Sequence, residues 1–419
     1  VKYTMIFQLM LVIEFRHQHH YIYRDLKNNN VIIDQNGTIV LIDFDRMVKY
    51  DDDSPRTNDL SSPFLAPEVN SGNFSYPADI FSLGKMIEYI INHNCNEIKN
   101  YEIIQKICNK CTKQNPNERP TISDLILDFC INFQSKIQID GLFQFYESFC
   151  NDSIYDNRFI LTIKNIFMNF DNAETQFSIA EIYDNGQYNV QIDMEKAIHF
   201  YELAATQNHS ESLFLLGLKY YSGKYVIKNI RKAADYFLLA ANQNHAKASA
   251  KIGTIYLSGI LGSINVKKAI YYLSIAAKAN IPYALHVLGT IYEDETYGVQ
   301  DIKKAIHYYE LGSKNNYAES QYSLGTFYYE GEYIEPDVNK AIRYYKLAAS
   351  QNHSESQFAL GLIYYEEQDI EKAIYYYELA ADQNHLSALN NLGNLYEERD
   401  IQKSIHYYEI AANENDPDA

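Results

Sequence analysis

Four side chains near the start of the chain could together act on a phosphate group. Asp25, Lys27 and Asn30 lie in the stretch YRDLKNNN, and Asp43 follows in IDFD. Phosphoryl transfer needs a positioned hydroxyl and neutralised charge more than covalent help from the protein. An aspartate can accept the hydroxyl proton, a lysine can contact the phosphoryl group, and Asn and Asp oxygens suit Mg²⁺. These residue types and their spacing therefore predict chemistry on phosphate.

The element before this stretch is expected to be a buried helix. The apolar run from Met5 to Ile13 is too short to span a bilayer. No small-residue cleavage pattern follows it, so it does not resemble a signal peptide. We therefore expect a helix that packs inside the domain and leads the chain into YRDLKNNN.

Five landmarks in order resemble eukaryotic-type protein kinases. They are YRDLKNNN (23–30), DFD (43–45), APE (66–68), ADIFSLG (78–84) and CTKQNPNERP (111–120). The first matches the catalytic loop H-R-D-L-x-x-x-N, with Tyr23 at the His position. Lysine two residues after the aspartate is what serine/threonine kinases carry, and the tyrosine-kinase-like group is the nearest resemblance. Together the landmarks predict a kinase C-terminal lobe in residues 1–135.

The resemblance implies a role for each matched residue. Asp25 is expected to be the catalytic base and Lys27 to contact the transferring phosphoryl group. Asn30 and Asp43 are expected to bind the cofactors, by holding Mg²⁺ for ATP. Four residues are expected to be structural: Arg24 before the catalytic Asp, Asp79 tying down the loop backbone, and Glu68 with Arg119 as a buried ion pair.

The activation segment, residues 43–68, carries three hydroxyl residues of interest. Ser61 lies where kinases often have a substrate-facing threonine. Ser54 and Thr57 are candidate phosphorylation sites, and Arg24 could pair with an added phosphate. Ordinary loop hydroxyls are the alternative interpretation.

The 20 residues before Tyr21 leave no room for the Gly-rich loop, strand lysine and helix glutamate that a kinase also needs. By itself the printed chain is therefore expected to bind ATP poorly and to show no useful activity. Two substitutions also depart from the family, Tyr23 for His and Asp45 for the Gly of D-F-G, although neither removes a catalytic group. The histidines at 17, 19 and 20 are expected to be structural or exposed, not metal ligands.

A repeat fills the C-terminal half. The lysine of MEKAIHFYELAATQNH (194–209) returns after 36, 36, 36, 36, 32 and 31 residues, and a glycine recurs in the same register. An Asp or Asn three residues before each lysine predicts the N-cap of a helix. The glycine falls inside a preceding helix, where it costs about 1 kcal/mol relative to Ala, so it predicts close helix–helix approach. The predicted caps are Asp193, Asn229, Asn265, Asp301, Asp337, Asp369 and Asp400.

These units resemble the Sel-one-like repeat, a relative of the tetratricopeptide repeat. The family box KA-x-x-WY-x-x-AA-x-x-G matches KAIRYYKLAASQN (340–352), with Tyr for Trp and Asn for Gly. The resemblance implies helix pairs that stack into a superhelix and bind proteins through a concave surface. The last two units are expected to keep both helices despite a shorter loop. The recurring histidines of QNH are expected to be turn or cap residues, not a metal ladder.

Composition excludes several functions. With 36 basic and 54 acidic residues the net charge is −18, which argues against nucleic-acid binding and against docking on anionic membranes. Five cysteines between Cys95 and Cys150 form no even framework, which suits a reducing, cytoplasmic setting. Cys108 and Cys111 have no second pair to complete a zinc site, so buried thiols are expected.

The sequence thus predicts a mainly α protein, a kinase C-terminal lobe (1–135) followed by a packed helical connector (136–172) and an α-solenoid of helix-pair repeats (173–419). Two functions stay open. One is a serine/threonine kinase that uses ATP and Mg²⁺ and recruits protein substrates and partners through its repeats. The alternative is a pseudokinase adaptor that acts only by binding proteins. A plain repeat scaffold is the third interpretation, if nothing precedes the printed chain.

Overall fold

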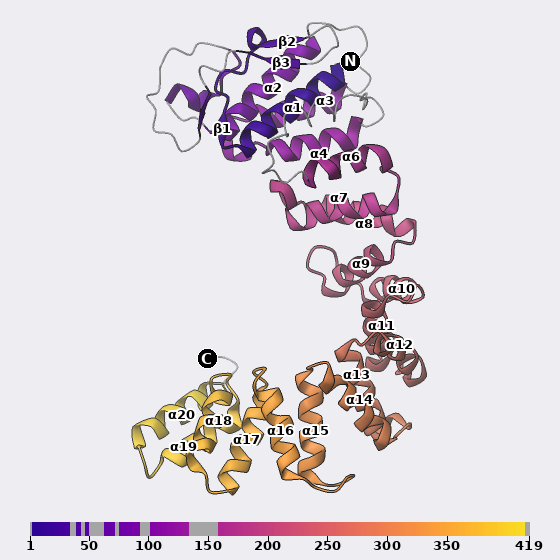
Figure 1. Ribbon diagram of the computed structural model, residues 1–419, viewed down its shortest axis with the longest axis vertical. Coiled ribbons are helices and arrows are strands. Elements are labelled where there is room, and N and C mark those ends of the chain that lie inside the picture. The colour runs from indigo at the N-terminus through magenta and orange to yellow at the C-terminus, as the bar shows by residue number, and fades with distance from the viewer. Residues whose placement is uncertain are drawn as a thin grey trace. The chain divides into compact units, whose positions relative to one another are not determined.

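The computed structural model describes residues 2–33, 39–42, 47–49, 63–71, 75–92, 101–133 and 158–414 (Figure 1). It divides into two compact units, residues 1–212 and 213–419, which are treated separately here. Helices dominate both units, so the predicted mainly α fold is confirmed. No helix in the described ranges is long and apolar enough to cross a lipid bilayer.

The first unit opens with a helical lobe that carries two small antiparallel ladders. β1 pairs with β4, and β2 pairs with β3 in the register Val31 to Leu41. The elements are α1 (Lys2–Gln18), β1 (Tyr21–Ile22), η1 (Asn28–Asn30), β2 (Val31–Ile33), β3 (Ile39–Leu41), β4 (Val48–Lys49), η2 (Pro67–Ser71), α2 (Tyr76–Asn92), α3 (Tyr101–Cys111), η3 (Pro116–Glu118) and α4 (Ile122–Phe133).

Helix α1 is the centre of this lobe. Phe7, Leu9 and Met10 are completely buried, which confirms the predicted buried helix. Phe7 stacks on Phe129 of α4 with ring centroids 6.1 Å apart. Every residue of α1 from Met5 to Glu14 is buried, and most of them are apolar, so several elements can cover the helix at once.

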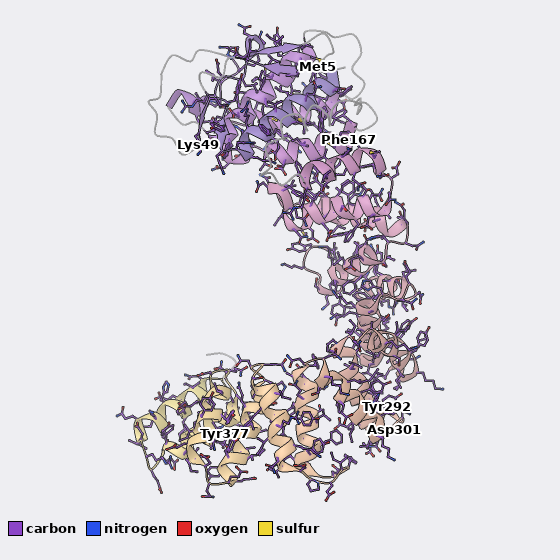
Figure 2. All side chains as sticks on the ribbon, viewed as in Figure 1. Met5, Lys49, Phe167, Tyr292, Asp301 and Tyr377 are labelled. Carbon is purple, nitrogen blue, oxygen red and sulfur yellow. The ribbon has the colours of Figure 1, made fainter. Side chains whose placement is uncertain are left out.

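The predicted connector is described only from residue 158 onward. There α6 (Arg158–Asn169) packs on the lobe, and the Phe167 ring meets Phe7 edge-on at 5.3 Å (Figure 2). Helix α7 (Ala173–Asn185) follows after the N-cap Asn172, whose side chain accepts the Glu174 N–H. This part of the chain is therefore helical and packed.

The first repeat is joined to α4 by polar contacts. Asp128 Oδ1 accepts from Tyr183 Oη at 2.9 Å and from Lys196 Nζ at 2.6 Å. Lys196 belongs to α8 (Met194–Thr206), and between α7 and α8 lies η5 (Gln187–Asn189). Burial pushes the pKa of Asp128 upward, but the Lys196 and Lys110 ammonium groups and the Tyr183 hydroxyl together outweigh burial and hold that pKa below its usual value. The pair therefore fastens the repeat to the lobe within one unit.

Seven helix pairs follow the predicted period. The first is α7 with α8. The others are α9 (Ser210–Ser222) with α10 (Ile230–Ala241), α11 (Ala246–Ser258) with α12 (Val266–Lys278), α13 (Pro282–Glu293) with α14 (Ile302–Lys314), α15 (Ala318–Glu330) with α16 (Val338–Ala349), α17 (Ser354–Glu366) with α18 (Ile370–Ala381), and α19 (Leu386–Tyr396) with α20 (Ile401–Glu414). A short η6 (Glu295–Tyr297) lies between α13 and α14.

All seven predicted N-caps are confirmed. In each, the Asp or Asn side chain accepts the N–H of the repeat lysine at 3.0–3.2 Å. The backbone N–H of the same cap residue donates to a tyrosine carbonyl in the preceding helix, as Asp301 does to Tyr292 at 2.8 Å (Figure 2). The shortened loop before Asp369 keeps this bond, to Tyr364 at 2.9 Å. The helix pair thus survives the deletion because both ends of the loop remain anchored.

The box AA-x-QNH ends one helix and starts the next. Asn208 has φ 62°, in the left-handed region, and its N–H donates to Ala205 O. The His209 N–H donates to Ala204 O, which completes a Schellman motif. Asn replaces the family's Gly because Asn tolerates this conformation better than most residues. Nδ1 of the next histidine then accepts an N–H of the following helix, at 3.1–3.2 Å, so the predicted cap role is confirmed for His209, His245, His353 and His385.

The mid-helix glycines mark the close contact within six of the seven pairs, from α9 with α10 onward, as predicted. A Cβ atom on Gly325 would lie 2.6 Å from the Tyr345 ring. The equivalent distances at the other five glycines are 2.4–2.7 Å, to a side chain of the partner helix. On the other side of the pair, the repeat lysine lies over a tyrosine ring, with Lys340 Nζ 4.9 Å from the Tyr328 centroid. Tyr328 also stacks on Tyr344 at 5.8 Å.

Replacing Gly325 by Ala should destabilise the repeats by about 1–3 kcal/mol, because the new methyl overlaps a buried ring. The sign of the stability change is diagnostic, since Gly→Ala at an exposed position inside a helix stabilises the helix by about 1 kcal/mol. Urea unfolding of the chain measures the effect. Ser323→Ala on the same helix is the control and should change little. A Gly325→Ala chain as stable as the original would contradict the close contact.

Replacing Asp128 by Asn should make the first unit roughly 1 kcal/mol less stable at pH 7, because the half-exposed Lys196 pair is lost. A carboxylate whose folded pKa is depressed stabilises the fold above its unfolded pKa, about 3.9, and stops doing so as pH falls through the folded value. The stability gap between the two chains should therefore close below about pH 3.9. Unfolding curves from pH 7 to acid test this, with the exposed Asp171→Asn as the control. A difference in unfolding free energy between the two chains that does not change with pH would contradict this prediction.

Candidate functional site

Three of the predicted site residues meet in the loop between β1 and β2. Asp25 is 3% exposed, and its Oδ2 accepts from Lys27 Nζ at 2.8 Å. Asn30, at the end of η1 and 4% exposed, donates Nδ2 to Asp25 O at 2.9 Å and to Asp25 Oδ2 at 3.2 Å. One carboxylate, one ammonium and one amide therefore share a single buried cluster.

Asp79, in the first turn of α2, holds the backbone of this loop. Its Oδ2 accepts the Tyr23 N–H at 2.8 Å, and its Oδ1 accepts the Arg24 N–H at 3.1 Å. His17 Nε2 lies 3.1 Å from Asp79 Oδ2. Arg24 has φ 67°, a left-handed conformation that L side chains rarely adopt. The carboxylate thus fixes a strained turn just before the candidate catalytic residue.

Tyr23, at the family's His position, connects the loop to β3. Its ring is 2% exposed, and its hydroxyl donates to Ile42 O at 2.6 Å. The Ile42 N–H in turn donates to Asn30 O at 2.9 Å. Ile42 directly precedes Asp43, the second candidate metal ligand, in sequence. Both bonds therefore fix the backbone at the residue before Asp43.

Glu68 and Arg119 form a bidentate ion pair. Arg119 Nη2 donates to Glu68 Oε2 at 2.8 Å, and Nη1 donates to Oε1. The guanidinium also donates to the carbonyls of Pro77 and Lys113, both at 2.8 Å, and lies 5.0 Å from the Phe81 ring centroid. Its side chain is completely buried. The pair therefore joins the start of η2 to the segment before α4.

Several sequence predictions fall outside the described residues. They are Asp43, Asp45, Ser54, Thr57 and Ser61.

The described cysteines of the lobe are buried, and the histidines that follow the apolar run of α1 lie beside other protein groups. Cys108 and Cys111 are buried free thiols; burial raises the pKa of Cys108 to about 12 and raises that of Cys111 further. His19 Nδ1 lies 2.6 Å from Phe15 O, and His20 Nδ1 lies 3.4 Å from Tyr76 Oη. Within the described ranges, no three His, Cys, Asp or Glu side chains are grouped closely enough to hold a metal ion.

Sequence reasoning missed two sets of contacts. His17 contacts Asp79. Its position before the catalytic loop was a signal from which this contact could have been predicted. Asp128 joins Lys196 and Tyr183 across 68 and 55 residues of sequence. No local pattern marks that contact, because Asp128 lies in the lobe and its partners lie in the repeat.

The family comparisons match both parts of the chain. The protein kinase domain matches residues 2–133. The Sel1 repeat matches seven successive segments: 173–209, 210–245, 246–281, 282–317, 318–353, 354–385 and 386–416.

Curated relatives cover the first part. A probable serine/threonine-protein kinase of Dictyostelium discoideum is 28% identical over 136 residues, which are 27% of this chain and 32% of the relative. The cAMP-dependent protein kinase type 3 of Saccharomyces cerevisiae is 34% identical over 125 residues, 28% of this chain and 30% of that protein. The chain thus spans about a third or less of these relatives.

A solved structure resembles the repeats. It is a protective antigen of uropathogenic Escherichia coli strains, described as displaying an SLR fold, with a TM-score of 0.57 at 20% identity over 82% of this chain and 74% of that one. At this identity the likeness concerns the fold alone. The repeat family accounts for more than half of the sequence, and the protein kinase domain matches the lobe before it. The chain belongs to the Sel1 repeat family and joins seven such repeats to a protein kinase domain.

Proposed function

We propose that the protein containing this chain is a serine/threonine kinase, which transfers the γ-phosphoryl group of ATP to protein hydroxyls. The observation that carries the proposal is the cluster of Asp25, Lys27 and Asn30 on one loop, with Asp25 Oδ2 2.8 Å from the lysine ammonium. The serine/threonine kinases among the relatives support the same substrate class. The whole protein's activity is part of the proposal, since this chain spans only part of those relatives.

In this mechanism Asp25 orients the substrate hydroxyl and accepts its proton as the oxygen attacks the γ-phosphorus. The bond from that phosphorus to the bridging oxygen breaks, and ADP leaves with the electron pair. Lys27, whose side chain is 27% exposed, can reach both Asp25 and a phosphoryl oxygen in front of it. Its ammonium then offsets the charge that spreads over the transferring group.

Asn30 fits a role as a Mg²⁺ ligand. Both of its hydrogen bonds use Nδ2, and its amide oxygen Oδ1 is the type of donor that Mg²⁺ prefers. Asp43 would supply the carboxylate ligand from the segment that follows Ile42. Mg²⁺, when bound, neutralises phosphate charge. The protein's contribution is to hold Asn30 in place through the Ile42 and Asp25 contacts.

The repeats are proposed to bind proteins. Their helix pairs repeat with the same caps and, from the second pair onward, the same glycine contacts to a side chain of the partner helix, so side chains on exposed faces recur at regular spacing. Such arrays offer extended binding surfaces. In the kinase proposal this surface recruits substrates or assembly partners for the lobe.

An adaptor without phosphoryl transfer is the alternative. Asp45 in place of the Gly of D-F-G favours it, because that segment then has less freedom to change conformation. In this alternative the lobe and the repeats act by protein binding alone.

The variant Asp25→Asn in the full reading frame separates the two functions. For the kinase, transfer of labelled phosphate from ATP to the protein itself and to casein should fall about 10²- to 10⁴-fold, because the base is lost. Asp235→Asn, an exposed substitution on α10, is the matched control and should keep full activity. Equal phosphate transfer by the Asp25→Asn protein, or none by the unsubstituted protein with ATP and Mg²⁺, would contradict the kinase and favour the adaptor.

A further inference from the structure

A hollow lies inside the first unit, between the kinase lobe and the start of the repeats. It consists of two adjoining cavities of about 350 and 410 Å³, which share Glu14, His17, Gln18, Tyr76 and Asn189. This junction hollow is closed on the lobe side by the ends of α1, α2 and α4, and on the other side by α6 and η5. Cavities of this volume are typical of sites for small molecules. None of the catalytic-loop residues lines it.

Glu14 is the charged group at the centre of the hollow. It is 4% exposed and lines both cavities. Its hydrogen-bond partners are neutral donors: Gln18 Nε2 at 2.9 Å and Ser123 Oγ at 3.2 and 3.3 Å. Burial raises the pKa of this carboxyl, although these donors and the nearby His17 partly oppose the effect. A carboxylate in this setting would gain from a cation that enters beside it.

The other charged groups at the hollow are already paired. Arg119 lines one cavity but is bound to Glu68, and His17 lies against Asp79. Within the described ranges, no lysine or arginine forms an ion pair with Glu14. The charge balance therefore favours a positive ligand over a negative one.

Aromatic side chains supply the walls. Tyr76, Phe159 and Tyr188 line the second cavity together with His20. The rings of Phe159 and Tyr188 lie 5.1 Å apart, and those of His17 and Tyr76 lie 4.6 Å apart. Aromatic faces beside a carboxylate are the surroundings that attract organic cations.

The wall contributed by η5 is fixed before any ligand arrives. Tyr188 and Asn189 have φ 57° and 61°, in the left-handed region, which asparagine tolerates but a tyrosine rarely adopts. Asn189 O accepts from Thr121 Oγ1 at 3.0 Å, and the Gln191 N–H donates to Asp124 Oδ1 at 2.8 Å. The lobe thus holds η5 in the conformation that closes the hollow, and a ligand would not need to order it.

We propose that the junction hollow binds a small aromatic cation, with its amine or amidine against Glu14 and its ring against the aromatic side chains. The proposal concerns binding alone. It does not depend on phosphoryl transfer, because Asp25, Lys27 and Asn30 take no part in the hollow. A failed kinase assay and a failed binding assay would therefore have separate meanings.

Benzamidine and benzamide test the proposal, because they share shape and differ in charge. Titration calorimetry and saturation-transfer NMR on the full chain should show benzamidine binding roughly tenfold or more tightly than benzamide, since a charge-assisted hydrogen bond replaces a neutral one. Glu14→Gln keeps the shape of the side chain and should remove this preference. Glu88→Gln, an exposed carboxylate on α2, is the matched control and should leave it intact.

A second variant protects the test against a folding defect in the first. Tyr188→Leu leaves Glu14 in place and removes one aromatic wall, so benzamidine should bind several-fold more weakly, while circular dichroism shows the helices intact. Three results would overturn the proposal: no benzamidine binding at millimolar concentration, equal binding of both probes, or a preference that persists in Glu14→Gln.

Discussion

The candidate site depends on one buried carboxylate. Asp79 is 2% exposed and accepts the N–H groups of two consecutive residues, Tyr23 and Arg24. A carboxylate without partners at that depth would be very costly, so the bonds stabilise Asp79 as much as they fix the loop. Its place in the first turn of α2 adds the favourable end of the helix dipole. Leu83 and Ile87 of α2 are completely buried, so the helix that carries Asp79 is anchored in the core.

This support explains how the loop can be strained and still well defined. Arg24 is held at φ 67°, and the next residue is Asp25, which then faces Lys27 and Asn30. The Tyr23 hydroxyl fastens the same loop to Ile42. Tyrosine at the family's His position thus serves as a bridge between two strands. The surrounding hydrogen bonds therefore fix the positions of the site residues, and the site residues contribute the functional groups.

The repeats were the most predictable part of the fold, because their signals are local and periodic. The Asp or Asn caps, the glycines and the histidines each recur in register, and each has one local physical role. The lysine–tyrosine contacts, such as Lys340 over Tyr328, were missed although both residues recur. Their spacing marks the period of the repeat, but recurrence alone does not indicate which side chain the lysine contacts.

The contacts between the lobe and the first repeat could not be predicted from the sequence. The landmarks of the lobe indicated which residues form the site, and they implied the Asp79 contact only through resemblance to kinases. Neither the Asp128–Lys196 pair nor the hollow around Glu14 could be foreseen. Both depend on how the lobe meets the first repeat, and no local pattern specifies that packing. Glu14 directly follows the apolar run Met5–Ile13, and no residue near it in sequence indicates that it lines a hollow.

The most direct test of this account is amide hydrogen exchange at Tyr23 and Arg24 in the Asp79→Ala chain. If Asp79 holds the loop, both amides should exchange about tenfold faster or more, since each loses a hydrogen bond to a charged group. Amides in the middle of α4, such as that of Leu127, should keep their protection, which would exclude general unfolding. Unchanged exchange at Tyr23 and Arg24 would contradict the claim that this carboxylate positions the catalytic loop.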